Sequence, residues 1–118
     1  MNQKSYFTAN KSTKETNGAF CRIEANGPAV TVYLNGEIDH HAAKGLREQV
    51  DTAIRRESPQ LLVLDFRDVT FMDSSGIGLI MGRYKQIKQL DGEIHITNPS
   101  PQIKKVLRLA GMDRLATI

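Results

Sequence analysis

The sequence predicts a small α/β domain in which a mixed sheet of four or five strands is flanked by helices. Three observations support this fold class. Short alternating apolar runs come first, a continuous apolar run follows at residues 61–64, and helical patterns separate the later strand candidates. The resulting order of elements is β-β-α-β-α-β-α, and strands that alternate with helices are typical of sheets with parallel pairs.

The chain has 118 residues, a length typical of one domain, and its first 18 residues differ in composition from the rest. Only four of these 18 residues are apolar, too few to offset the entropy lost on ordering. We therefore predict a flexible tail at residues 1–18 and a domain at residues 19–118. The tail carries +2 of the formal net charge of +3, which leaves the domain almost neutral. Proteins that bind nucleic acid concentrate basic charge on the folded domain, so no direct nucleic-acid contact is expected.

A single cysteine and the absence of long apolar segments bear on the location of the protein. Cys21 alone cannot form an intrachain disulfide, which fits a reducing compartment. The apolar run Leu61–Leu64 is far shorter than the roughly 20 residues that a transmembrane helix needs. The N-terminal segment also has no apolar core typical of a secretion signal. We therefore expect a cytoplasmic protein that makes no membrane contact.

Two runs of alternating apolar residues predict an antiparallel hairpin near the start of the domain. The first covers residues 21–25 and the second residues 30–34, and Asn26-Gly27-Pro28 between them has the composition of a turn. Cys21 falls on the apolar side of the first run, which predicts a core position rather than a reactive thiol. Asn35-Gly36 is expected to end or bend the second strand.

A helix, a strand and a connector are predicted next. Apolar residues at spacings of three and four indicate a helix over residues 43–54, with Asp39 placed to cap it and Ser58-Pro59 placed to end it. The apolar run at residues 61–64, which ends at Asp65-Phe66, is typical of a strand that is covered on both faces. Residues 67–72 are predicted to connect this strand to the following helix.

The most regular helical pattern runs from residue 77 to residue 87. A short strand at residues 94–96 and a last helix over residues 103–110, ended by Gly111, complete the pattern. Right-handed crossovers place the helices that link parallel strands on one face of the sheet. Basic residues near the end of the 77–87 helix are interpreted as a solvated helix face: Arg83, Lys85 and Lys88.

Residues 71–78, Phe-Met-Asp-Ser-Ser-Gly-Ile-Gly, join the buried strand to this helix and form the most informative motif. Asp73 and the two serines are good helix caps, so a purely structural role is one interpretation. Two hydroxyls and an acid exceed what one cap requires. Gly76 and Gly78 weaken a helical turn while allowing another backbone to approach closely. The second interpretation is therefore a docking surface for another protein.

The start of a helix also tolerates added negative charge. A phosphate on Ser74 would bring a charge of about −1.5 to −2 next to free backbone N–H groups and the positive end of the helix dipole. The fold would survive this change, whereas a partner packed on the same spot would have to bury a dianion or dissociate. The motif is therefore compatible with a switch that changes binding and leaves the fold intact.

Three segments carry a family resemblance. They are residues 36–41 (Gly-Glu-Ile-Asp-His-His), residues 72–78 (Met-Asp-Ser-Ser-Gly-Ile-Gly) and residues 82–89 (Gly-Arg-Tyr-Lys-Gln-Ile-Lys-Gln). In this order they resemble the STAS-domain anti-sigma-factor antagonists, and most closely the sporulation-type anti-anti-sigma factors. The similarity extends from about Val30 to Leu115 and implies a STAS-like version of the predicted fold.

The resemblance implies that Ser74 is a phosphoacceptor and that the partner is an anti-sigma factor with serine-kinase activity. In this family the unphosphorylated protein binds that kinase and frees the sigma factor. Phosphorylation ends the interaction, and a serine phosphatase restores it. The family acts by binding, so the chain is expected not to be an enzyme. The implied partner-binding residues are Asp39, which matches an acidic residue near the phosphoserine, together with Asp73, Ser75, Gly76 and Ile77.

Two features depart from the family's pattern. The N-terminal segment is longer than usual, and the sequence stops at Ile118, where family members continue into a further C-terminal helix. Without that helix an edge or a face of the sheet could be exposed. We expect a monomer, and such an exposed edge or face leaves a dimer as the alternative.

A metal site finds little support in the sequence. Asp39, His40 and His41 are adjacent, but neighbouring residues at a helix start point in different directions, and His95 belongs to a separate strand. No cysteine or glutamate completes a ligand set at the usual zinc spacings. No metal is therefore expected.

A hydrolase with Ser74 or Ser75 as nucleophile is the alternative enzyme function. Neither serine fits the Gly-x-Ser-x-Gly motif, and no oxyanion site is evident. The glycines at positions 76, 78 and 82 do not match the dinucleotide-binding fingerprint either, so no cofactor is expected. A small serine hydrolase and an interaction scaffold that does not switch remain as alternatives to the phosphorylation switch.

Overall fold

The computed structural model describes residues 5–8 and 20–118, and its five strands form one sheet in the order β1-β2-β3-β4-β5. The first two pairs of strands are antiparallel and the last two are parallel, so the predicted mixed sheet is confirmed. The strands are β1 (Ser5–Thr8), β2 (Phe20–Asn26), β3 (Ala29–Ile38), β4 (Leu61–Met72) and β5 (Glu93–Thr97). The helices are α2 (His40–Glu57), α3 (Ser74–Gln89), α4 (Pro101–Leu109) and the short 3-10 helix η1 (Met112–Arg114).

Strand β1 lies within the segment that the sequence predicts to be a flexible tail. Its residues pair antiparallel with β2, with Ser5 opposite Ala25 and Thr8 opposite Arg22. A strand added to an open sheet edge is held by backbone hydrogen bonds, which composition alone does not reveal. The remainder of the predicted tail, residues 1–4 and 9–18, lies outside the described residues.

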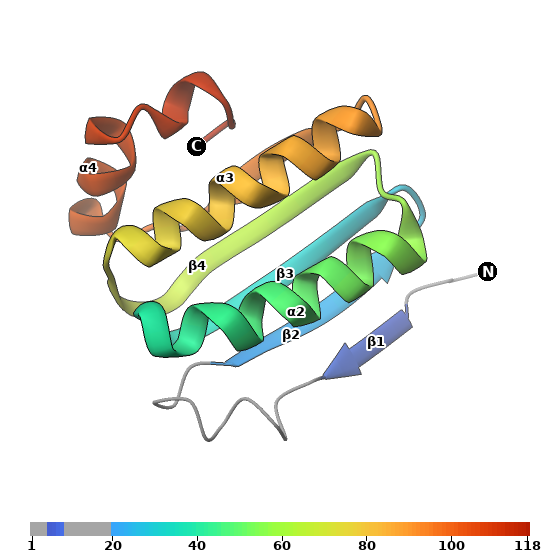
Figure 1. The fold of residues 1–118 in the computed structure, drawn as a ribbon, viewed down its shortest axis with the longest axis horizontal. Coiled ribbons are helices and arrows are strands. Elements are labelled where there is room, and N and C mark those ends of the chain that lie inside the picture. The colour runs from blue at the N-terminus through green and yellow to red at the C-terminus, as the bar shows by residue number, and fades with distance from the viewer. Residues whose placement is uncertain (1–4, 9–19) are drawn as a thin grey trace.

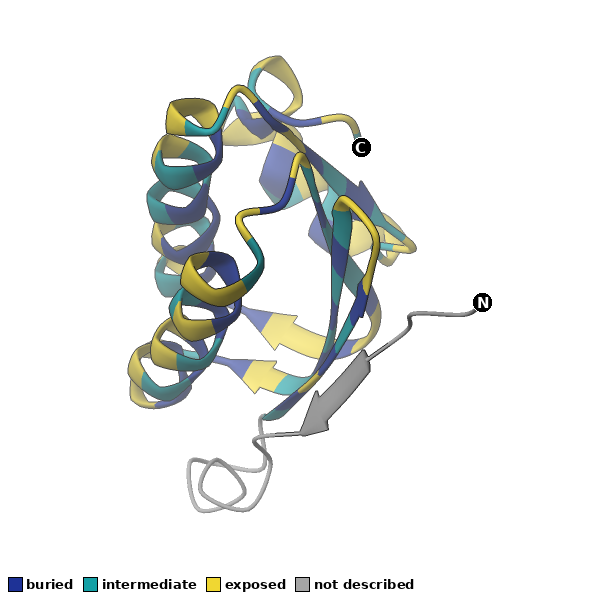
Figure 2. Cartoon of the chain, turned by 90° about the vertical axis from the view of Figure 1, so that its right-hand side faces the viewer, coloured by how far each residue is buried: buried dark blue, intermediate teal, exposed yellow. Residues whose placement is uncertain are grey.

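Helices α2 and α3 lie side by side across one face of the sheet (Figure 1). Each of them links two parallel strands, so the expectation that the two share a face is confirmed. Figure 2 shows that the buried residues of these helices lie on the side that faces the sheet. One apolar core unites the sheet, α2, α3 and α4, and it includes Cys21, Ile23, Val32, Leu46, Leu62, Leu64, Phe66, Ile80, Ile87, Ile96 and Leu107.

The prediction that residues 67–72 form a connector is wrong, because they continue strand β4. They pair in parallel with the end of β3, so that Ile38 lies opposite Met72. The register shifts near Gly36, whose φ of 93° is in the region that favours glycine. Asn35-Gly36 therefore bends β3 without ending it. As a consequence, β3 and β4 finish together at one edge of the sheet.

The prediction that β4 is covered on both faces is also wrong. Leu62 and Leu64 are buried against the helices, whereas Leu61 and Val63 point to the opposite face and are only partly buried. Both connecting helices pack on one side of the sheet, so the outer face of the strand keeps contact with water. The guanidinium of Arg22 lies 4.0 Å from the ring centre of Tyr33 on this outer face.

The last residues of the chain return to the edge of the sheet. The Ile96 N–H donates to the Thr117 carbonyl (2.7 Å), and the Thr117 N–H donates to the Ile94 carbonyl (3.0 Å). This segment therefore covers part of the β5 edge. No helix in residues 20–118 is both long and apolar enough to cross a membrane.

Candidate functional site

The starts of α2 and α3 lie next to each other because they follow two neighbouring parallel strands. β3 ends at Ile38 and β4 ends opposite it at Met72. The backbone N–H of Asp73 donates to the carbonyl of Ile38 (3.2 Å), which ties the two strand ends together. The carboxyl ends of parallel strands are a common location for binding sites in open α/β sheets. This edge, with its two helix N-termini, is therefore the candidate site.

Two aspartates cap these helices. The Asp39 carboxylate accepts a hydrogen bond from the Ala42 N–H (3.0 Å), and the Asp73 carboxylate accepts one from the Ser75 N–H (2.8 Å). Each cap satisfies a backbone donor that the helix leaves free and places negative charge at the positive end of the dipole. The predicted caps at Asp39 and Asp73 are therefore confirmed.

Ser74 is the first residue of α3, and its side chain is exposed. Ser75 and Ile77, which follow it in the first turn of α3, are partly buried. Asp39 is also partly buried and lies at the neighbouring helix start. The edge therefore brings together most of the residues that the sequence singles out, with the Ser74 hydroxyl open to an approaching protein.

Gly76 differs from the other residues that the sequence singles out at this edge, because it is buried. A methyl group at this position would overlap the Met72 side chain, so the glycine lets α3 begin directly on the end of β4. Gly78 is exposed, and a methyl group there would meet no atom within 4 Å. Gly76 therefore allows the close packing beneath the site, whereas Gly78 forms part of its surface.

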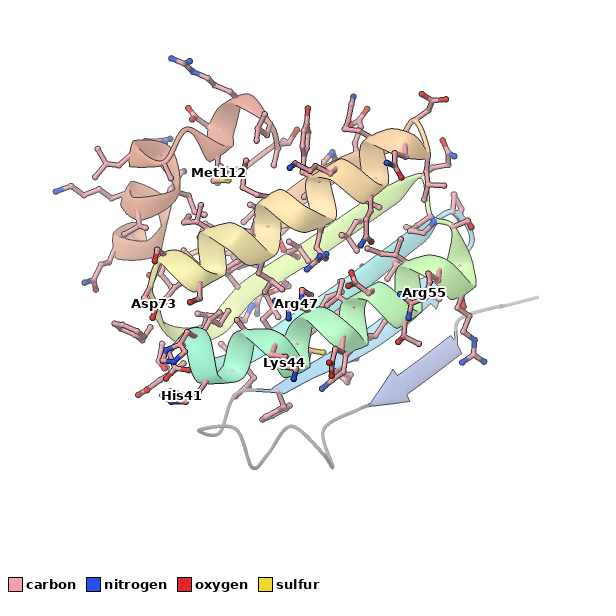
Figure 3. All side chains as sticks on the ribbon, in the orientation of Figure 1. His41, Lys44, Arg47, Arg55, Asp73 and Met112 are labelled. Carbon is pink, nitrogen blue, oxygen red and sulfur yellow. The ribbon has the colours of Figure 1, made fainter. Side chains whose placement is uncertain are left out.

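A groove of about 420 Å³ runs between the N-terminal halves of the two helices. Its walls carry His40, Lys44 and Arg47 from α2 and Ser75 from α3, and its remaining lining residues are Ala43, Gly78 and Leu79. Figure 3 shows Lys44 and Arg47 on α2 and Asp73 at the start of α3. The sequence analysis missed these two cations, although the spacing of residues 40, 44 and 47 places them on one helix face.

The second half of the same helix pair is closed by a buried ion pair. The Arg83 Nε lies 3.0 Å from Asp51 Oδ1, and the Gln86 amide donates to the same oxygen (2.8 Å). Arg83 is only 5% exposed, so its assignment to a solvated helix face is wrong. Burial lowers the pKa of Arg83, the Asp51 carboxylate raises it, and the nearby Arg47 lowers it. The pattern of charged residues alone did not reveal that Asp51 faces Arg83 across the helix pair.

The histidines do not converge on a metal-binding arrangement. The rings of His40 and His41 lie 4.1 Å apart at the start of α2, whereas His95 is in β5 and its Nε2 is 3.2 Å from Glu93. Residues 5–8 and 20–118 contain no group of three or more side chains positioned to bind a metal ion.

The serines also lack the partners of a catalytic nucleophile. In the described part of the chain, no hydrogen bond joins the hydroxyl of Ser74 or Ser75 to a histidine. A serine nucleophile requires a base within hydrogen-bonding distance, oriented by a third group. Ser74 presents an exposed hydroxyl at the start of a helix.

Comparison with known sequences places the whole α/β unit in one family. A family model for the STAS domain matches residues 21–118. An anti-sigma F factor antagonist from Paenibacillus polymyxa is 38% identical over 96 residues, which are 81% of this chain and 82% of that protein. An anti-sigma-B factor antagonist from Staphylococcus aureus is 31% identical over 84 residues, which are 71% of this chain and 77% of that protein.

Solved structures show the same arrangement of strands and helices. The anti-sigma factor antagonist SpoIIAA in its unphosphorylated form matches with a TM-score of 0.74 and 33% identity, over 82% of this chain and 85% of that chain. The Bacillus cell fate determinant SpoIIAA in its phosphorylated form matches with a TM-score of 0.67 and 33% identity, over 82% of this chain and 88% of that chain. The fold therefore accommodates both states of that protein.

Proposed function

The chain belongs to the STAS-domain family, and we propose that it is an anti-sigma factor antagonist controlled by phosphorylation of Ser74. In its unphosphorylated form it binds an anti-sigma factor that is also a serine kinase, and the sigma factor is released. Transfer of the γ-phosphoryl group of ATP to the Ser74 hydroxyl ends the interaction, and a serine phosphatase restores it. The chain acts as a regulated binding protein and as a kinase substrate in the cytoplasm, not as an enzyme.

The position of Ser74 is the observation that carries this proposal. Its side chain is exposed at the first position of α3, where the dipole of a 16-residue helix favours negative charge. A phosphate at this position can receive hydrogen bonds from backbone N–H groups or water without entering the core. A partner that covers the same position loses its fit, because it would have to bury a dianion.

The contact surface that we propose surrounds Ser74 at the shared edge of β3 and β4. Asp39 and Asp73 contribute their caps and their negative charge, and Ser75 and Ile77 contribute partly buried surface on α3. Gly76 does not form part of the contact surface itself, but its lack of a side chain lets the first turn of α3 pack against Met72. The resulting unit is a monomer that needs no cofactor of its own.

Phosphorylation by the anti-sigma factor from the organism that carries this chain tests the proposal. Incubation with that protein and ATP is expected to add one phosphate, which peptide mass spectrometry assigns to Ser74. Ser74→Ala is expected to abolish the modification and to retain binding, since an exposed hydroxyl contributes little to the fold. Ser75→Ala is the matched control, and it is expected to remain a substrate.

Two results would contradict the proposal. One is a phosphate found only on Ser75, or on no residue, under conditions in which the kinase phosphorylates itself or a reference substrate. The other is equal affinity of the anti-sigma factor for the phosphorylated and unphosphorylated chains in a direct titration.

A further inference from the structure

Among the described residues, the cations of the groove between α2 and α3 have no ion-pair partner. Lys44 and Arg47 are exposed on the α2 side, and neither has a carboxylate within ion-pair distance among the described residues. The residues that line the groove include no acid. The two helix N-termini at the same edge are already capped by the Asp39 and Asp73 carboxylates, so the positive charge of the groove comes from the side chains of Lys44 and Arg47. The groove lining therefore carries positive charge that no carboxylate of the described residues pairs with.

The buried ion pair further along the same helices engages one of the acids of α2. Asp51 follows Arg47 by one helical turn on α2, and its carboxylate is already shared by Arg83 and Gln86. Arg47 acts on Arg83 as a like charge and lowers its pKa. An additional carboxylate in the groove would therefore relieve repulsion as well as form new ion pairs.

The chemical nature of the residues that line the groove restricts which anion can bind there. Ala43, Gly78 and Leu79 supply apolar lining surface, while His40, Lys44, Arg47 and Ser75 supply polar groups. An acidic side chain also combines an apolar part, its methylene groups, with a polar part, its carboxylate. A methylene stem can lie on the apolar part of the groove while its carboxylate meets the cations, in the manner of long charged side chains at interfaces.

We propose that this groove receives an acidic side chain, glutamate or aspartate, from the surface of the anti-sigma factor. The inference rests on the proposed function, because the groove is continuous through Ser75 with the surface around Ser74. The occupied groove anchors the partner on α2, and Ser74 lies next to that anchor at the start of α3. Lys44 and Arg47 thereby determine which anti-sigma factors bind, and the contact makes the affinity dependent on salt.

Charge reversal tests the groove directly. Lys44→Glu and Arg47→Glu are each expected to weaken binding of the anti-sigma factor about tenfold at 50 mM NaCl, and the double variant about 100-fold. The double variant is also expected to show a smaller change in affinity between 50 and 300 mM NaCl than the original chain. Arg55→Glu is the matched control, because Arg55 is exposed near the end of α2, far from the groove (Figure 3), and Thr52 is its one hydrogen-bond partner among the described residues (3.4 Å). Its affinity is expected to stay within about twofold.

Unfolding by denaturant separates a lost contact from a damaged fold. Arg47→Glu is expected to keep or raise the stability, since it removes the like charge near Arg83. If the original chain binds but the double variant binds equally well with an unchanged salt dependence, the groove proposal is overturned and the proposed function stands. If the original chain does not bind the anti-sigma factor at all, the proposed function fails, and this inference fails with it.

Discussion

The two halves of the α2–α3 helix pair differ in whether their cationic side chains are paired with a carboxylate of the same chain. In the half that is remote from Ser74, Asp51 neutralises the buried Arg83, and Gln86 completes the contact. In the half next to Ser74, Lys44 and Arg47 stay exposed and unpaired within the described chain, and a groove separates the helices. We call the half with the Asp51–Arg83 ion pair the closed half, and the half with the groove and its unpaired cations the open half.

This difference separates stability from binding along a single pair of helices. A buried charge requires a partner within the fold, because an unpaired one would be strongly destabilising. An exposed charge costs the fold little and remains available to another protein. We therefore expect substitutions of the paired charged residues in the closed half to change the free energy of unfolding, and substitutions of the exposed charged residues in the open half to change affinity.

The largest expected effect is that of Asp51→Ala on stability. The substitution leaves Arg83 buried without its counter-charge, and we expect the free energy of unfolding in urea to fall by about 3 kcal/mol. This is the lower end of the usual range, because the Asp51 side chain is 19% exposed. The double variant Asp51→Leu/Arg83→Met, which removes both charges, is expected to recover most of the loss. Equal destabilisation by the single and the double variants would contradict the account of the closed half.

Gly76→Ala is expected to have the next largest effect, again on stability. The added methyl group overlaps the Met72 side chain, and displacing it should lower the free energy of unfolding by about 1–3 kcal/mol. Gly78→Ala is the matched control, because its methyl group meets no atom and alanine favours a helix by up to about 1 kcal/mol. Urea unfolding of both variants measures the contrast, and a loss of stability in Gly78→Ala would show that the open half is less tolerant than we infer.

Ser74→Asp is expected to change affinity with little effect on the fold. A carboxylate at the first position of α3 is favoured by the helix dipole, so the free energy of unfolding should stay within about 0.5 kcal/mol of the original. Binding of the anti-sigma factor should weaken at least about tenfold, because the partner must accommodate the charge. Titration and circular dichroism measure the two quantities. Unfolding of the variant would contradict a switch that leaves the fold intact.

Much of this fold was predictable because its signals are local. The alternation at residues 21–34 and the helical spacing at residues 77–87 depend on neighbours in the sequence, and both elements were predicted. The caps at Asp39 and Asp73 are equally local, and they located the site. What could not be predicted depends on pairing across the fold.

Two residues show where sequence reasoning stopped. Val69 belongs to the segment predicted as a connector, and it is part of β4 only because the end of β3 supplies a parallel partner opposite it. Arg83 has the sequence context of a surface residue, and only the packing of α2 against α3 provides Asp51 at 3.0 Å. The groove escaped prediction for the same reason, since its walls come from residues about 30 positions apart in the chain.

The smallest expected effect concerns Cys21, which reports whether the groove opens by movement of α2. Its thiol is fully buried and donates to the Gln49 side chain of α2 (3.1 Å), and burial raises its pKa to about 12. At pH 8 the folded thiol is therefore neutral and covered, and we expect labelling by a thiol reagent only after unfolding. The same shift lowers stability as the pH rises from about 9 to about 12, because the unfolded thiol ionises first.

Labelling in the presence of the anti-sigma factor then distinguishes two kinds of docking. If the groove is preformed, the partner binds without lifting α2 from β2, and Cys21 stays as unreactive as in the free protein. Ser74→Asp should also leave the labelling rate unchanged, because its effect is confined to the exposed edge. Faster labelling of Cys21 on binding would show that α2 moves and that the closed half of the helix pair is not fixed, which would remove the distinction between a stabilising half and a binding half.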